Sequence, residues 1–338
     1  MKTCLIVKTS SLGDILHTLP ALTEAKQHEP NLKFDWVIEK SFAEIPRWHE
    51  AVDEVIEIEI RKWRKNIFKY FSEIRAFKKR LKAKHYDYVI DAQGLLKSAW
   101  ITKTAKGIKY GLDKESAREP AASFFYNKKL KVEKAMHAII RVKYLFAKVF
   151  GYESSSNVGY GIKYEWSVTQ AKKQVVFLHA TTWSSKHWAL SHWQSLAKLL
   201  AKADIKVLLP WGNEQERKQA NLIAHNNSNT IVLEKMQLSQ LAELFSQSQA
   251  VVAVDTGLAH LAAACGAPVI GIYGSTSAKL TGALGKQVIH LSSTLTCSPC
   301  LKKVCPITKD LFAPCEVSIA TQSVYDKLMS IIQASIVH

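Results

Sequence analysis

Short runs of apolar, mostly β-branched residues alternate along the whole chain with longer segments of helical periodicity. This alternation is typical of parallel α/β sheets, in which each strand is connected to the next by a helix. Helices are expected between the runs, for example over residues 14–27 and 238–248. The predicted strands are residues 4–8, 34–39, 55–58, 88–91, 175–179, 205–210, 230–233, 250–255 and 268–273.

The chain has 338 residues, which is long for a single hydrophobic core and sufficient for two. Residues 152–173 are rich in Ser and Gly, have little helical periodicity, and are the predicted linker. We therefore expect a first domain over residues 1–160 and a second over 161–318, followed by a helix over 319–338 for which packing back onto the first domain is one option. Ligands of open α/β sheets lie at the carboxyl ends of the strands, so two such domains facing each other would share one cleft.

The net charge of +17 is unevenly distributed, and residues 61–84 alone carry 11 basic residues and one acid. Such a surface implies an anionic partner, which could be nucleic acid, an anionic membrane or a phosphorylated or carboxylated substrate. No recognised nucleic-acid-binding module is present. Arg61 and Arg64 lead into a predicted amphipathic helix, and Arg118 is a further candidate for anion contacts; a merely solvated face is the alternative. The expected apolar face of that helix is Ile67, Phe71, Ile74 and Leu81.

The N-terminal apolar run, residues 4–7, is shorter than the apolar core of a signal peptide, and no stretch approaches the ~18 apolar residues of a bilayer span. We therefore expect a cytoplasmic protein. Its six cysteines are then expected to be thiols or metal ligands rather than disulfides.

A hydroxyl-rich turn with an acid follows the first predicted strand. Its residues are Ser10, Ser11, Gly13 and Asp14. Ser and Asp at this position are typical of a helix cap. A carboxylate at the carboxyl end of a strand is also a candidate general base, and both interpretations stay open at this point.

Two segments of the second half have the residues that a diphosphate requires. Thr181, Thr182 and Lys186 follow one buried strand and supply short donors and a point charge. Another strand leads directly into a helix start, where backbone N–H groups and the helix dipole attract phosphate. The residues of this second segment are Asp255, Thr256, Gly257, Leu258 and His260.

Glu216 and Met236 follow two further strands of the second half. A carboxylate at the position of Glu216 could accept hydrogen bonds from ribose hydroxyls, as in dinucleotide-binding folds. Met236 could contact the face of an adenine. For both residues, core packing or surface solvation is the alternative.

Together these segments resemble the lipopolysaccharide heptosyltransferases, glycosyltransferases of the two-domain B-type fold, and within them the heptosyltransferase I branch. The resemblance extends to about residue 285 and rests on residues 5–22, 89–95, 177–182, 186–188 and 254–258. It implies two doubly wound, Rossmann-like domains facing one cleft. The implied donor is ADP-L-glycero-β-D-manno-heptose, and the implied acceptor is the Kdo sugar of Kdo2-lipid A at the cytoplasmic face of the inner membrane. A non-catalytic anion-binding protein is the alternative from another class.

The resemblance also implies roles for individual residues. Asp14 matches the catalytic base, and Lys186 matches the group that neutralises departing ADP. Arg61, Arg64 and Arg118 match basic positions that meet the acceptor, which places acceptor binding in the first domain. The matched donor-binding positions are Ser10, Ser11, Gly13, Thr181, Thr182, Lys186, Glu216, Met236, Asp255, Thr256, Gly257, Leu258 and His260. The sequence contains no Asp-x-Asp motif, so no phosphate-bridging metal cofactor is implied.

A cysteine-rich segment departs from the heptosyltransferase I pattern and is more similar to heptosyltransferase II and other relatives, which leaves that branch open as an alternative. It contains Cys297, Cys300, Cys305 and Cys315. The C-x-x-C spacing of the first pair is typical of thiolates that chelate one ion. The sequence thus leaves open a structural zinc or iron site and four unligated thiols.

Overall fold

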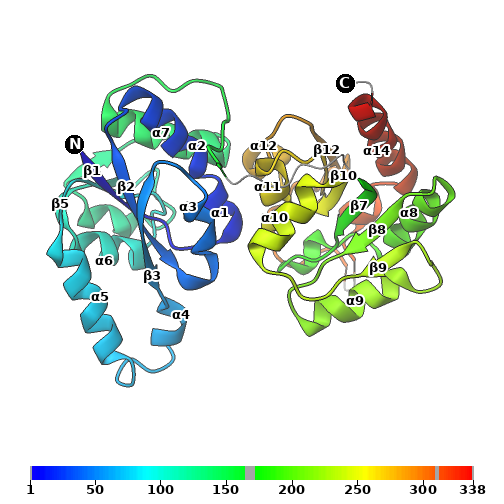
Figure 1. Cartoon of the computed structure of the whole chain (residues 1–338), viewed down its shortest axis with the longest axis horizontal. Helices are drawn as coiled ribbons and strands as arrows, with labels where there is room; N and C mark the ends of the chain where they lie inside the picture. Colours follow the sequence, from blue (N-terminus) through cyan, green and yellow to red (C-terminus); the bar gives the residue numbers. More distant parts are fainter. Residues whose placement is uncertain (1, 164–171, 309–311, 337–338) are drawn as a thin grey trace. The chain divides into compact units, whose positions relative to one another are not determined.

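The computed structural model describes residues 2–163, 172–308 and 312–336, which form two compact units divided between residues 164 and 165 (Figure 1). The first unit has the strands β1 Thr3–Val7, β2 Lys33–Glu39, β3 Val52–Ile58, β4 His85–Asp91, β5 Lys106–Leu112 and β6 Lys128–Leu130. Its helices are α1 Leu12–Leu16, α2 Leu19–His28, α3 Glu44–Arg47, α4 Ile60–Trp63, α5 Phe71–Ala83, α6 Leu96–Thr104 and α7 Ala138–Phe150, with the 3₁₀ helices η1 Lys40–Phe42 and η2 Pro120–Phe125.

The second unit repeats this alternation. Its strands are β7 Lys172–Leu178, β8 Lys206–Leu209, β9 Thr230–Val232, β10 Ser248–Val254, β11 Val269–Tyr273 and β12 Val288–Ser292. Its helices are α8 Leu190–Lys202, α9 Glu214–Ala224, α10 Leu238–Ser246, α11 Gly257–Ala264, α12 Ala278–Thr281, α13 Pro314–Val317 and α14 Thr321–Ile336, with the 3₁₀ helix η3 Ser184–Lys186. None of the helices in the described ranges is both long and apolar enough to cross a bilayer.

Both sheets are parallel and have the same strand order. The first is β3-β2-β1-β4-β5-β6 and the second is β9-β8-β7-β10-β11-β12. Each therefore has a switch point, where the order reverses beside its first strand, between β1 and β4 in one and between β7 and β10 in the other. Ligands of doubly wound sheets bind at the carboxyl ends of the strands beside such a point. The prediction of doubly wound α/β architecture is confirmed.

The nine predicted strands are present, and three more, β5, β6 and β12, complete the sheets. The missed strands lie toward the sheet edges and contain few fully buried residues, so their sequences lack an apolar run. The predicted helix over residues 14–27 is two helices, α1 and α2.

The last helix, α14, belongs to the second unit. Val324, Leu328 and Ile332 are buried in a core that also contains Trp193 of α8 and Val252 of β10. Packing of this helix against the first domain stays a prediction. The apolar side chains of α14 supply part of the core that covers the second sheet.

The described part of the predicted linker is attached to the first unit. The ammonium of Lys143, fully buried in α7, donates a hydrogen bond to the Ser155 carbonyl at 2.7 Å and lies 3.4 Å from Glu24. Further along, Lys163 N donates to the Trp48 carbonyl at 2.9 Å. Residues 152–163 thus belong to the first unit, and the division between the two units falls within the predicted linker. Residues 164–171 lie outside the described residues.

Candidate active site

The loops at the first switch point are held together by hydrogen bonds. Val7 of β1 pairs with Asp91 of β4, so the residues that follow the two strands are neighbours. Gln93 accepts both the backbone N–H and the hydroxyl of Thr9, at 2.8 and 2.9 Å. The Lys8 ammonium donates to the Ala92 carbonyl at 2.8 Å. These bonds fix the start of the turn that leads to Asp14.

Asp14 lies in the first turn of α1 and takes part in a capping box. The backbone N–H and the hydroxyl of Ser11 donate to its Oδ2 at 3.1 and 3.0 Å. Its other oxygen lies 3.8 Å from the Lys8 ammonium, and the Asp14 side chain is 31% exposed, against 7% for Lys8. The capping interpretation is therefore correct in geometry, but the carboxylate also remains accessible to a reactant.

The charges around Asp14 determine its ionisation. Burial would raise its pKa, but Lys8, His17, the Ser11 amide and Arg118 together lower the pKa to about 2. Burial and the nearby cations Arg118 and Arg141 lower the pKa of Lys8, opposed by Asp14 and Asp91. Asp14 is thus an ionised carboxylate whose Oδ1 lies 3.8 Å from the buried ammonium of Lys8.

Further cations lie in the same electrostatic neighbourhood. The Lys97 ammonium donates a hydrogen bond at 3.0 Å to the hydroxyl of Ser10, one of the predicted site residues. Burial lowers the pKa of Lys97, Arg61 and Arg64 lower it further, and Glu39 and Asp14 oppose this. The structure therefore brings Ser10, Ser11, Gly13, Asp14, Arg61, Arg64 and Arg118 together at one end of the first sheet, with both arginines of the basic stretch exposed.

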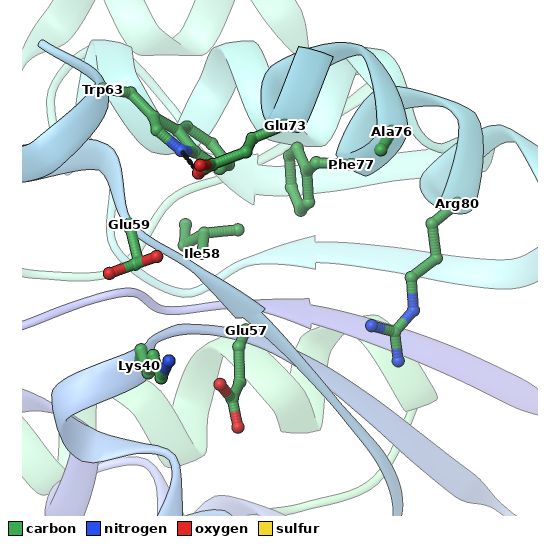
Figure 2. A pocket seen from close by; sticks show the side chains of 9 residues that line it. All are labelled: Lys40, Glu57, Ile58, Glu59, Trp63, Glu73, Ala76, Phe77 and Arg80. Atoms are coloured by element: carbon green, nitrogen blue, oxygen red, sulfur yellow. Dashed lines mark hydrogen bonds between the residues drawn. The ribbon is translucent and has the colours of Figure 1, made fainter. Parts of the chain in front are cut away.

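A cavity of about 320 Å³ lies beneath the basic stretch, between β3, α4 and α5. Figure 2 shows Trp63 and Phe77 on one side, with the Trp63 indole bonded to Glu73, and Glu57 and Lys40 on the other. That bond is 3.0 Å long, and Lys62 bonds to Glu73 at 3.1 Å. Glu73 thus connects α4 to α5, and this connection positions the segment that carries Arg61 and Arg64.

In the second unit, a lysine follows the first strand of the sheet, as Asp14 does in the first unit. Lys186 ends η3, directly after the loop that follows β7, and its ammonium lies 2.7 Å from Asp255 Oδ2, at the end of β10. Thr181 donates its hydroxyl to the Asp255 carbonyl at 3.0 Å. The Lys186 ammonium also lies over the Trp183 ring, 4.3 Å from its centroid. Thr181, Lys186 and Asp255 therefore form one bonded group, and the neighbouring Thr182 is exposed.

Helix α11 begins beside this group. Thr256 is its N-cap with extended backbone, and Gly257 and Leu258 open its first turn. The first N–H groups of a helix have no partner within the helix and carry the positive end of its dipole. His260, predicted to share this end, is buried in the same helix. The arrangement fits a diphosphate, as the sequence indicated.

Glu216 and Met236 are less tightly connected to this group. Glu216 accepts the Gly212 N–H and the Asn213 side-chain amide, both at 2.7 Å, and its own carbonyl lies 3.2 Å from His179 Nε2. The bond to His179 places Glu216 next to the strand that leads to Thr181. Met236 is half-buried in the loop between β9 and α10, and its role as an adenine contact stays a prediction.

Sequence reasoning missed a second buried acid near Lys186. Glu316 of α13 accepts the N–H groups of Gly274 and Ser275 through Oε1, at 3.0 and 3.3 Å. Burial raises its pKa to about 7; the two amides oppose the shift, Asp255 raises the pKa further and Lys186 lowers it. Glu316 lies 61 residues from Asp255 in sequence and next to a cysteine, so no local pattern indicated it.

The four cysteines of the C-terminal segment are free thiols in the structure. Cys297 is exposed, Cys300 and Cys305 are half-buried, and Cys315 is buried. Burial raises the pKa of Cys315 to about 11, with Glu316, Cys300 and Cys297 adding to the shift. Across the described ranges, no three His, Cys, Asp or Glu side chains are arranged to hold a metal ion. The thiols as placed here do not fit the zinc or iron site, which stays a prediction.

Comparisons with known proteins find relatives that are similar in sequence and in overall structure. The chain is 47% identical over 307 residues to lipopolysaccharide heptosyltransferase 1 of Pseudomonas aeruginosa, covering 89% of this chain and 86% of that protein. The structure of the Escherichia coli heptosyltransferase WaaC with ADP has a TM-score of 0.85 at 43% identity, covering 97% of this chain and 99% of that one. The complex of WaaC with ADP-2-deoxy-2-fluoro heptose has a TM-score of 0.82 at 42% identity, with the same coverage.

The sequence profile of glycosyltransferase family 9, the heptosyltransferases, matches residues 74–310. This match includes β4 and the whole Lys186–Asp255 group. The predicted resemblance and the predicted enzyme class are confirmed. The chain belongs to glycosyltransferase family 9 and is a heptosyltransferase.

Proposed function

We propose that this enzyme transfers L-glycero-D-manno-heptose, with inversion, from ADP-L-glycero-β-D-manno-heptose to the Kdo sugar of Kdo2-lipid A. The observation that carries the proposal is Asp14, an accessible carboxylate held ionised at the switch point of the first sheet. An inverting transfer needs one base for the acceptor hydroxyl and one cationic site for the leaving diphosphate. The two sheets offer one of each, at corresponding positions.

The donor is assigned to the second unit. Lys186 supplies a point charge, Thr182 is exposed to donate its hydroxyl, and the N-terminal amides of α11 lie next to Asp255. These groups attract the two phosphates of ADP through charge-assisted hydrogen bonds. Support comes from the relative of 43% identity whose structure contains ADP, and from its complex with a fluorinated ADP-heptose.

The acceptor is assigned to the first unit. Arg61, Arg64 and Arg118 are exposed cations in the neighbourhood of Asp14 and match the carboxylate and phosphates of a Kdo-bearing lipid. An anionic acceptor beside Arg118 offsets part of the positive potential that lowers the pKa of Asp14. Acceptor binding therefore raises the pKa of Asp14 and makes the carboxylate a stronger base when the acceptor hydroxyl is in place.

In the proposed step, the acceptor oxygen bonds to the anomeric carbon of heptose while the bond from that carbon to the ADP oxygen breaks. The hydroxyl proton moves to Asp14, and ADP leaves with the electron pair of the broken bond. Lys186 and the α11 amides balance the charge that develops on the diphosphate. Asp255 is a positioning residue, since it holds the Lys186 ammonium at 2.7 Å.

Because the acceptor is a lipid, we also propose peripheral attachment to the cytoplasmic face of the inner membrane. The 11 basic residues within residues 61–84 support attraction to anionic headgroups. The transfer itself is proposed to need no metal. Elemental analysis of protein purified without added metal tests the cysteine site: less than a tenth of an equivalent of zinc plus iron would remove that prediction.

A paired transfer assay tests the proposed function. The purified chain is given ADP-heptose with Kdo2-lipid A, or with the same lipid already carrying one heptose, and the products are identified by mass spectrometry. We expect one added heptose on the first acceptor and none on the second. Transfer to the second acceptor alone would assign a heptosyltransferase II activity, and no turnover with either would leave only a binding protein.

A further inference from the structure

The turn between α4 and α5 exposes a group of large apolar side chains. The sequence pattern predicted Ile67 and Phe71 on the apolar face of one amphipathic helix, but α5 begins only at Phe71, and its buried residues are Phe77 and Leu81. Ile67 is 58% exposed, Phe68 93% and Phe71 62%. Figure 1 shows this turn projecting from one end of the first unit. Three such side chains within five residues form a contiguous apolar tip, unlike the isolated exposed residues that are normal on protein surfaces.

Cations without an ion pair lie on the turn that carries this apolar tip (Ile67, Phe68 and Phe71) and continue along α5. Within the described residues, Lys65 and Lys69 of the turn form no ion pair, and the same holds for Arg75, Lys78, Lys79 and Lys82 of α5. The acids of the region are occupied elsewhere: Glu73 binds Lys62 and Trp63, and Glu54 binds Arg80. Phe68 and its neighbours therefore project from a surface of uncompensated positive charge.

The neighbouring elements continue the same combination of side chains. Lys78 of α5 lies over the ring of Trp100 of α6, at 4.6 Å, and Trp100 is itself exposed. Helix α6 packs against η2, where Phe124 is 81% exposed and Lys129 lies 5.9 Å from its ring centroid. Aromatic rings with adjacent lysines are typical of side chains at a membrane–water interface.

We propose that the surface formed by the apolar tip, α5 and α6 is a bilayer-docking face, on which Phe68 and Phe71 insert into the interfacial region of a membrane containing anionic phospholipid. The charges attract the protein to the headgroups, and the rings enter the apolar boundary below them. Charge complementarity selects this occupant over an uncharged apolar partner. Arg61 and Arg64 directly precede the apolar tip, so docking would bring the proposed acceptor site to the depth of a lipid headgroup; this consequence rests on the proposed function.

The two contributions respond differently to salt and mutation. Each cation near an anionic leaflet strengthens binding by about fivefold at low ionic strength, and this gain fades as salt rises. Inserted phenyl rings contribute through apolar burial, which salt does not screen. A protein held by charge alone is released by salt, whereas an inserted protein retains part of its affinity.

The test is flotation of the full chain with vesicles of phosphatidylglycerol and phosphatidylethanolamine, in the absence of donor and acceptor. Phe68→Ser/Phe71→Ser should weaken partition by about tenfold or more at 0.15 M salt. The matched control is Leu222→Ser, which changes a side chain that is 54% exposed in α9 of the second unit. Unchanged partition of the double variant, or an equal loss in the control, would overturn the proposal.

Two further measurements distinguish bilayer insertion from a role in the sugar site and from self-association. The double variant should unfold at the wild-type temperature and keep wild-type turnover with a deacylated, water-soluble Kdo acceptor. Lost turnover with that acceptor would place the phenyl rings in the sugar site instead. A wild-type dimer that the variant no longer forms, seen by light scattering, would assign the tip to a second copy of the chain. The vesicle measurement is independent of transfer, so failure of the proposed function would leave its result intact.

Discussion

The two sheets have the same strand order, yet their switch points have opposite charge arrangements. In the first unit an accessible carboxylate, Asp14, has a buried lysine behind it at 3.8 Å. In the second unit the lysine, Lys186, is held by a carboxylate at 2.7 Å, and the two side chains are only 14% and 9% exposed. The shared topology determines where a reactive group lies, whereas the loop after the first strand determines its sign. Under the proposed function, one fold then supplies both the base and the leaving-group site.

Replacing the accessible acid of the first unit is the strongest test of this contrast. Asp14→Asn should lower turnover by about 100- to 10,000-fold, because the amide cannot accept the acceptor proton. Affinity for ADP should stay near the wild-type value, since the groups proposed to hold the diphosphate, Lys186, Thr182 and the α11 amides, belong to the second unit. Steady-state kinetics and calorimetry measure the two quantities. Asp53→Asn, at an exposed acid paired with Lys33, is the control, and near-normal turnover of Asp14→Asn would reduce Asp14 to a helix cap.

The reciprocal change removes the cation of the second unit. Lys186→Ala should weaken ADP and ADP-heptose binding alike, by about 30-fold, because it removes the point charge on the diphosphate and leaves Asp255 without its partner. Lys198→Ala, at an exposed position of α8, should leave the affinity unchanged. Calorimetric titration with ADP decides the matter. Equal ADP affinity in wild type and Lys186→Ala would contradict the assignment.

Charge reversal at Arg61 and Arg64, in α4 and at its C-cap, tests whether these two cations contact the acceptor. Arg61→Glu/Arg64→Glu should raise the KM for the lipid acceptor by about tenfold at low salt, and less as salt rises. Donor affinity should not change. Lys198→Glu/Lys202→Glu makes the same change in net charge on α8 and should leave the acceptor KM unaltered. If both double variants raise the acceptor KM equally, the net charge of the protein, rather than a contact at Arg61 and Arg64, causes the effect.

Glu316 allows a test in which stability, not activity, is measured. Its folded pKa of about 7 lies above the ordinary 4.5 of an unfolded chain, so its contribution to stability is complete below about 4.5 and is lost as pH rises through about 7. Glu316→Gln keeps an oxygen for the Gly274 and Ser275 amides but does not ionise. Relative to wild type, the variant should gain roughly 3 kcal/mol in free energy of unfolding between pH 4.5 and 8.

Urea denaturation at the two pH values measures this difference. Glu234→Gln, at an exposed residue of the same unit, is the control and should show the same pH dependence as wild type. A constant difference between wild type and Glu316→Gln at both pH values would mean that Glu316 ionises normally inside the fold.

The buried central strands could be predicted from the sequence, whereas β5, β6 and β12, toward one edge of each sheet, could not. Central strands such as β1 and β10 are almost fully buried and appear as apolar runs. By contrast, β6 is three residues, Lys-Lys-Leu, whose pairing with β5 depends on backbone hydrogen bonds that leave no mark on composition. The start of α5 was also predicted wrongly, because Ile67 has helical spacing relative to Phe71. In the structure Ile67 lies on the turn before α5 and is exposed.

Candidate site residues could be proposed from the sequence where one short segment contains a strand end, a helix start and a polar side chain, as around Asp14 and Thr256. Residues that act across the fold were missed. Gln93 binds Thr9 from 84 positions away, and Glu316 approaches Lys186 from 130 positions away. Only the folded sheet makes such pairs neighbours, because adjacent parallel strands are connected through long crossovers. The buried role of Lys8 likewise depends on the Ala92 carbonyl.

Each six-stranded ladder is complete within its own contiguous half of the chain, on either side of the division between residues 164 and 165. A genetic crossover at that division would exchange a whole sheet, with its helices, without separating any paired strands. A chimera made there would therefore combine the complete first unit of one enzyme with the complete second unit of another. For protein engineering, this division is the boundary at which chimeras of two such enzymes should be joined.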